Sequence, residues 1–432
     1  MDILASYNLI IEASLIIILS FFFSELSRKT NIPSVLMLIV LGIGLRFGLD
    51  NMGMGYLDFF PVLEVLGIVG LIMIVLEAAL ELELHKDKLI PIGKAMLIAL
   101  LGLVLSAWVS AEILEHYVPG MTPRQAWIYA TPLSILSSAI IIPSVSGLQA
   151  LKKEFHIYES TFSDILGIIL FYFLIGPYES TSQGGELGGF FGTLFLTILI
   201  SVVASYLIVV IFQNIRSQVK LFLLIAVLLL LYALGKQMHL SSLIIILIFG
   251  LLIANRGIFF QGRLAKLLHV EKAKEIYQGL HILTLESSFV VRTFFFVIFG
   301  ITINLASLAD IRVVGISLLI LATIYLIRWV LLRLFMGSNI TPQWAIAPRG
   351  LITILLFYAI PADAQVLAFE PGILLFVILF TGLIMTGAMI FDKRRHQRAI
   401  RVAQSVPVGY TRWEAPQIHL SRQEEDGHTT KE

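Results

Sequence analysis

The chain has 432 residues, of which 58% are hydrophobic and 14% charged, and it carries a net charge of +1 with no cysteine. So apolar a composition excludes a soluble globular protein, and the charge gives no indication of a nucleic-acid partner. The lack of cysteine excludes disulfides, thiolate metal sites and thiol catalysis. The sequence therefore predicts an all-helical, polytopic membrane protein in contact with lipid.

Thirteen mainly apolar stretches follow one another along the chain. Several approach or exceed the roughly 18 residues that a helix needs to cross a ~30 Å hydrocarbon core. In chain order, the predicted transmembrane helices lie at 6–24, 33–49, 61–82, 93–115, 125–148, 157–175, 188–213, 219–235, 239–255, 279–304, 313–335, 342–361 and 371–391.

Lysines and arginines are concentrated in alternate connections between these stretches. If the N-terminus lies outside, the cytoplasmic connections are basic and the outer ones hold few such residues. The positive-inside rule therefore predicts a multi-pass protein of the cell (inner) membrane with a cytoplasmic C-terminus. Residues 1–392 would form the transmembrane domain, and the polar residues 393–432 a short tail that we expect to be disordered.

The fifth and twelfth stretches contain matching irregularities, Pro143 with Gly147 and Pro348 with Gly350. A proline removes a backbone donor and interrupts a helix. Thirteen helices also divide into two six-helix halves of opposite orientation around a linker helix, which is a common build of secondary transporters. We therefore expect inverted repeats whose broken helices cross at a binding site, and the alternative is a pair of ordinary kinks.

Asp164 is the ionisable residue placed about two turns into the sixth stretch. Ser160 lies on the same helical face four residues earlier, and Ser163 is adjacent. A carboxylate beside hydroxyls suits a small hard cation such as Na⁺, and the same group can take a proton instead. The alternative is an aspartate that is neutralised by an arginine of another helix.

Glu159 lies five residues before Asp164, about 140° around the helix, so the two carboxylates cannot point the same way. A buried charge needs a partner, and Arg328 in the eleventh stretch reaches a similar depth. The sequence therefore predicts a fixed ion pair between Glu159 and Arg328, with Arg349 as the alternative partner.

Four further residues are candidates for a gate or an auxiliary role. Glu77 could line the entry path, and Arg292 could pair with Glu286 if another helix intervened; Pro143 marks the irregular fifth stretch. His156, near a helix start, is expected to be a surface group. No Walker, GxSxG or HExxH motif occurs, so the sequence predicts neither an enzyme nor a cofactor.

The segment Glu159-Ser-Thr-Phe-Ser-Asp164 resembles the E-S-x-x-N-D motif in helix 6 of sodium/proton exchangers of the monovalent cation:proton antiporter superfamily. The segments "LIRWVL", "PRGLITILLF", "FFFVIFGITI" and "LIMIVLEAALELEL" are similar to helices 11, 12, 10 and 3 of that family. The resemblance covers most of residues 1–392, and its pieces occur in the family's order.

This resemblance implies a thirteen-helix fold and a homodimer. A core domain, residues 93–175 and 313–391, would move against a dimerisation domain, residues 6–82 and 188–304. It also implies that Asp164 binds Na⁺ and the proton, that Ser160 is a ligand, and that the pair of Glu159 and Arg328 is stabilising.

Two departures from the family pattern affect the site. Ser163 stands where the family has Asn or Asp, and Ile141 and Ile142 precede Pro143 where many members have T-D-P. Serines at 137, 138 and 144 could supply oxygens instead.

The first hypothesis is an electroneutral antiporter that exchanges Na⁺, K⁺ or Li⁺ for protons by alternating access. The alternatives are a non-transporting sensor and an organic-anion symporter of the bile-acid type.

Overall fold

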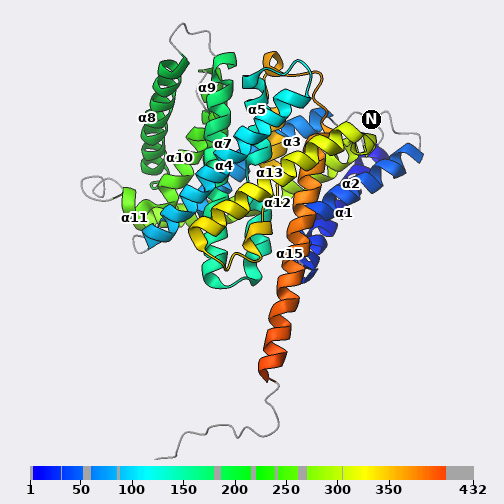
Figure 1. The fold of residues 1–432 in the computed structure, drawn as a ribbon. Coiled ribbons are helices and arrows are strands. Elements are labelled where there is room, and N and C mark those ends of the chain that lie inside the picture. The colour runs from blue at the N-terminus through cyan, green and yellow to red at the C-terminus, as the bar shows by residue number, and fades with distance from the viewer. Residues whose placement is uncertain are drawn as a thin grey trace, which may run out of the picture. The chain divides into compact units, whose positions relative to one another are not determined.

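The computed structural model describes residues 3–30, 32–51, 60–84, 88–179, 186–215, 220–238, 242–260, 270–303 and 305–404. These residues form helices joined by short connections, and no strand occurs among them (Figure 1). The chain divides into residues 1–390 and a second unit, residues 391–432. The all-helical class predicted from composition is confirmed.

The helices follow the order of the predicted stretches. They are α1 (Ile3–Thr30), α2 (Ser34–Asn51), α3 (Phe60–Glu81), α4 (Leu89–Tyr117), α5 (Pro123–Ser134), α6 (Ser138–Ser144), α7 (Ala150–Glu179), α8 (Glu186–Phe212), α9 (Lys220–Gln237), α10 (Ser242–Ala254), α11 (Arg256–Phe259), α12 (Val270–Thr302), α13 (Ile311–Met336), α14 (Leu351–Tyr358) and α15 (Gly372–Gln404), with 3₁₀ turns η2 (Val145–Gly147), η4 (Leu305–Ala309), η5 (Gln343–Ala345) and η6 (Ala362–Ala364).

Each of the thirteen predicted stretches coincides with one helix or with a pair of short ones. Within the described ranges, eight helical segments are long and apolar enough to cross a membrane, and three further apolar helices are shorter. Among the helix starts, the largest differences are those of α7 and α12, which begin at Ala150 and Val270, well before the predicted limits of 157 and 279. Their first turns are rich in Lys and Glu, which favour helix without being apolar.

The last helix, α15, continues to Gln404, beyond the predicted end at 391. Residues 393–404 of the predicted disordered tail are therefore helical. The remaining residues of that tail, 405–432, lie outside the described part of the chain.

Helices α2 and α12 approach each other at two glycines. A Cβ atom at Gly42 would collide with the carbonyl oxygen of Val297, and one at Gly300 would collide with that of Ile39. Small residues allow helix backbones to come this close inside a membrane, where packing rather than the hydrophobic effect drives association.

Replacing Gly42 by alanine should therefore lower the midpoint of thermal unfolding in detergent, because the added methyl group meets backbone that cannot rotate away. We expect a cost of about 1–3 kcal/mol. Gly44→Ala is the matched control, since nothing lies within 4 Å of a Cβ there. Equal midpoints for the two variants would show that this contact does not limit stability.

The fifth and twelfth stretches are both broken, and their breaks touch. Residues 135–137 separate α5 from α6, and residues 346–350 separate η5 from α14. The N–H of Ser137 donates to the carbonyl oxygen of Pro348 at 2.9 Å. A Cβ at Gly350 would collide with the Ser137 side chain, so the close approach requires glycine at this position.

The position of the first break differs from the predicted one. Pro143 lies inside α6, and the chain is instead extended at residues 135–137. The start of α5 is local in origin, because Thr122 and Gln125 form a capping box around Pro123. Its end is held by contacts with other parts of the chain, described below.

Candidate functional site

Asp164 lies in the middle of α7 and is only 1% exposed. Its Oδ2 accepts a 3.4 Å hydrogen bond from the backbone N–H of Ser138, the first residue of α6. Its Oδ1 has no hydrogen-bond partner among the described residues. The carboxylate thus lies beside the break in the fifth stretch and keeps one oxygen available to a ligand.

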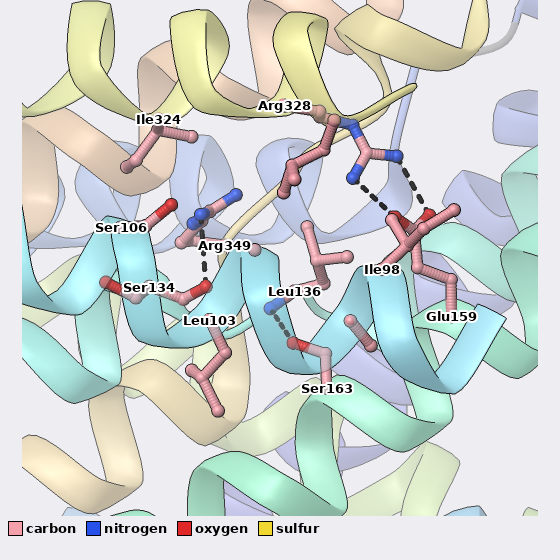
Figure 2. A pocket seen from close by; sticks show the side chains of 13 residues that line it. Ile98, Leu103, Ser106, Ser134, Leu136, Glu159, Ser163, Ile324, Arg328 and Arg349 are labelled. Carbon is pink, nitrogen blue, oxygen red and sulfur yellow. Dashed lines mark hydrogen bonds and ion pairs between the residues drawn. The ribbon is translucent and has the colours of Figure 1, made fainter. Parts of the chain in front are cut away.

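The two predicted serine ligands have different surroundings. The Ser160 hydroxyl donates to the backbone carbonyl of His156 at 2.7 Å, in the preceding turn of α7. The Ser163 hydroxyl accepts the backbone N–H of Leu136 at 3.0 Å, as the dashed line in Figure 2 marks. Ser163 therefore satisfies a donor that the break in the fifth stretch leaves without a helical partner.

Glu159 and Arg328 form a bidentate ion pair between α7 and α13. Nη1 and Nη2 of Arg328 lie 2.8 and 2.9 Å from the two carboxylate oxygens, and the two side chains point toward each other in Figure 2. Both are buried, with 1% of Glu159 and 8% of Arg328 exposed. Nε of Arg328 also donates to the carbonyl of Gln343 at 3.1 Å. This is the pairing predicted from the depths of the two charges.

His156 is buried, in contrast to the predicted surface position, and it belongs to the same cluster. None of its surface is exposed, and Nδ1 lies 3.2 Å from Oε2 of Glu159. One signal for this contact is present in the sequence, since a residue three positions before Glu159 lies on the same helical face.

Arg349 is 2% exposed and binds backbone rather than a carboxylate. Its guanidinium donates to the carbonyl oxygens of Leu133 at 2.8 Å, Ser134 at 3.2 Å and Ala347 at 2.7 Å. Figure 2 shows the bond to Ser134. The first two carbonyls are at the C-terminal end of α5, where helix dipoles favour a cation. Arg349 therefore stabilises the first break and is not the hydrogen-bonded partner of Glu159.

Glu77 and Arg292 form a second ion pair, in which one nitrogen, Nη2 of Arg292, lies 3.1 and 2.9 Å from the two carboxylate oxygens. Arg292 also donates to the carbonyl of Ala139 at 3.4 Å. That carbonyl lacks its usual helical donor, because Pro143 has no N–H. The predicted pairing of Arg292 with Glu286 is wrong: Glu286 is exposed, and the partner comes from α3.

Two cavities lie toward opposite ends of α3. One, of about 290 Å³, is lined by Glu77 and Glu81 near the C-terminal end of α3 and by Ser138 of α6. The other, of about 720 Å³, is lined by Gly67 near the N-terminal end and by Tyr172 of α7. The first cavity reaches Ser138, whose N–H contacts Asp164, so this end approaches the buried carboxylate more closely.

Touching helix breaks beside a buried, incompletely bonded carboxylate are typical of membrane transporters. The family model for the transmembrane part of sodium/hydrogen exchangers matches residues 15–391, and the chain belongs to this family.

The fold is similar to that of the sodium proton antiporter MjNhaP1 from Methanocaldococcus jannaschii. Its structure at pH 8 has a TM-score of 0.62 and 18% identity, and the match covers 92% of this chain and 98% of that chain. A structure from an electron-microscopy map has a TM-score of 0.59 and 18% identity, covering 94% and 100%. No curated protein sequence matches.

Membership of this family makes the chain a multi-pass membrane transporter whose activity is the antiport of sodium ions and protons. The prediction of an exchanger is confirmed. Neither the sensor nor the organic-anion symporter receives support from the comparisons.

Proposed function

We propose that this chain exchanges one Na⁺, or another alkali cation, for one proton at a single carrier group, Asp164. The supporting observation is the buried carboxylate whose Oδ1 has no partner in the described ranges. An isolated charge there would be costly, so the group needs either a proton or a cation. Because it cannot hold both, binding of one ion releases the other.

The hydroxyl geometry supports Ser160 as a ligand. Its hydrogen is directed to the carbonyl of His156, which leaves the oxygen lone pairs for a cation held by Asp164. Ser163 has a supporting role, because its oxygen already accepts the N–H of Leu136. The Ser163 oxygen would therefore share its lone pairs between that hydrogen bond and a bound cation.

Transport would follow alternating access. The core, residues 93–175 and 313–391, moves against the dimerisation domain, residues 6–82 and 188–304, in a homodimer with its N-terminus outside. The two cavities toward opposite ends of α3 support such a motion. The pair of Glu77 and Arg292 lines the smaller cavity and contacts α6 through Ala139, which suits a gate at the cation entry path.

Exchange by the purified protein in proteoliposomes should be electroneutral. Asp164 is the one carrier carboxylate in this scheme, and the pair of Glu159 and Arg328 stays ionised throughout the cycle. The loaded core then has the same charge with a proton or with a cation, so membrane potential has no charge to act on.

The test measures dissipation of a pH gradient after addition of Na⁺, K⁺ or Li⁺, with taurocholate as the control for an organic-anion symporter. An imposed inside-negative potential should leave the rate unchanged. A marked dependence on that potential would contradict the one-for-one scheme and point to Glu77 as a second proton carrier.

A further inference from the structure

The ion pair of Glu159 and Arg328 has a third member, His156, which comes from the same helix as the carboxylate. The imidazole is fully buried, and its Nδ1 lies 3.2 Å from Oε2 of Glu159. That oxygen also accepts Nη2 of Arg328 at 2.9 Å. Both arginine donors belong to α13, so His156 is the donor that fixes the carboxylate relative to α7.

The geometry also indicates which nitrogen of the His156 ring carries the hydrogen. An ionised carboxylate only accepts hydrogen bonds, so Nδ1 carries the hydrogen. Nε2 is buried and has no partner within the described ranges. A second proton would have no acceptor there and would place another cation beside Arg328. The contact therefore uses the neutral Nδ1–H tautomer, with Lys152 one turn earlier as the other nearby charge.

An apolar side chain would suit these surroundings better if packing were the only requirement. The neighbouring Phe155 packs against an apolar cluster of Ile98, Leu332 and Ile340. Burying an imidazole nitrogen without a partner is unfavourable. The residue also contributes its backbone carbonyl to the Ser160 hydroxyl, so one turn of α7 positions both the fixed charge and the proposed ligand.

We propose that His156 is a positioning residue for cation exchange, and that its Nδ1–H completes the hydrogen bonding which holds Glu159 in place on α7. This inference rests on the proposed function, in which Asp164 carries the ion and Glu159 does not touch it. The contribution of His156 is therefore to the exchange rate and not to cation contact.

Asparagine and leucine at position 156 provide the test, because their side chains have the same branched arrangement of four heavy atoms and differ in the ability to donate. The amide of His156→Asn can take the place of Nδ1–H, whereas His156→Leu cannot donate. Packing in apolar surroundings predicts that leucine is better tolerated, and helix propensity also favours leucine. The donor role predicts the opposite order.

We expect His156→Leu to lower the maximal exchange rate per folded protein about tenfold, in keeping with the loss of a hydrogen bond to a charged group. His156→Asn should stay within about threefold of the parent protein, and the half-saturating Na⁺ concentration should change in neither. Phe155→Leu is the control for lost volume beside the site and should not reproduce the effect of His156→Leu.

Thermal unfolding in detergent gives a second readout that does not depend on transport, and the asparagine variant should unfold at the higher temperature. If His156→Leu equals or exceeds His156→Asn in both rate and unfolding temperature, the positioning role is wrong. Measuring Asp164→Asn in the same vesicles separates the positioning role of His156 from the carrier role of Asp164. Exchange that persists in this variant overturns the carrier role of Asp164, and the unfolding order still decides the role of His156.

Discussion

Replacing Asp164 by asparagine is expected to abolish cation-dependent dissipation of a pH gradient while leaving a folded protein. The amide has nearly the same shape, and its oxygen can still accept the N–H of Ser138. It can neither take up the transported proton nor supply the negative charge that compensates a dehydrated cation. Both halves of the exchange are therefore lost together.

The stability of the Asp164→Asn variant should equal or exceed that of the parent protein, because a buried carboxylate has been replaced by a neutral group. Glu286→Gln is the matched control, since this carboxylate lies on a transmembrane helix but is exposed. It should exchange normally. Normal exchange by a well-folded Asp164→Asn protein would remove this residue from the transport cycle.

The helices were predictable from the sequence because a membrane requires each spanning segment to be apolar and internally hydrogen-bonded. The same constraint identified Asp164 and the pair of Glu159 and Arg328, since charges at depth are costly and need partners. These inferences use only depth along one helix. They do not require knowledge of how the helices face each other.

The first break could not be located in this way, because the nearby prolines, Pro132 and Pro143, both lie inside helices and the break itself is held by distant residues. Three consecutive N–H groups from the break into α6 are bound by other parts of the chain: those of Leu136 by Ser163, Ser137 by Pro348 and Ser138 by Asp164. Pro143 is the visible helix breaker in the sequence, yet its missing N–H is accommodated within α6. Its effect is to leave the Ala139 carbonyl for Arg292.

His156 was misplaced for a related reason. It follows Lys152, Lys153 and Glu154 near the start of α7, a pattern typical of an exposed helix end. Its burial comes from neighbouring helices, as the packing of Phe155 against residues of α4 and α13 indicates. Long-range packing of this kind leaves no periodic signal in the sequence.

Removing either partner of the pair between Glu159 and Arg328 should destabilise the protein by about 3–5 kcal/mol, because a buried charge is left without its counter-ion. The double variant should cost less than the sum of the single ones. The losses of stability in the two single variants should also differ from each other. Without Arg328 the carboxylate keeps the donor of His156, whereas without Glu159 the guanidinium keeps one backbone carbonyl, that of Gln343.

A double-mutant cycle on thermal unfolding in detergent measures this coupling, using Glu159→Gln and Arg328→Gln. Glu77→Gln and Arg292→Gln form a comparison cycle at a more exposed pair, 13% and 17%, in which a single arginine nitrogen contacts both carboxylate oxygens. Because solvent screens charges that remain partly exposed, the coupling in that cycle should be smaller. Additive losses at Glu159 and Arg328, or a larger coupling at the more exposed pair, would show that burial of the ion pair does not determine its contribution.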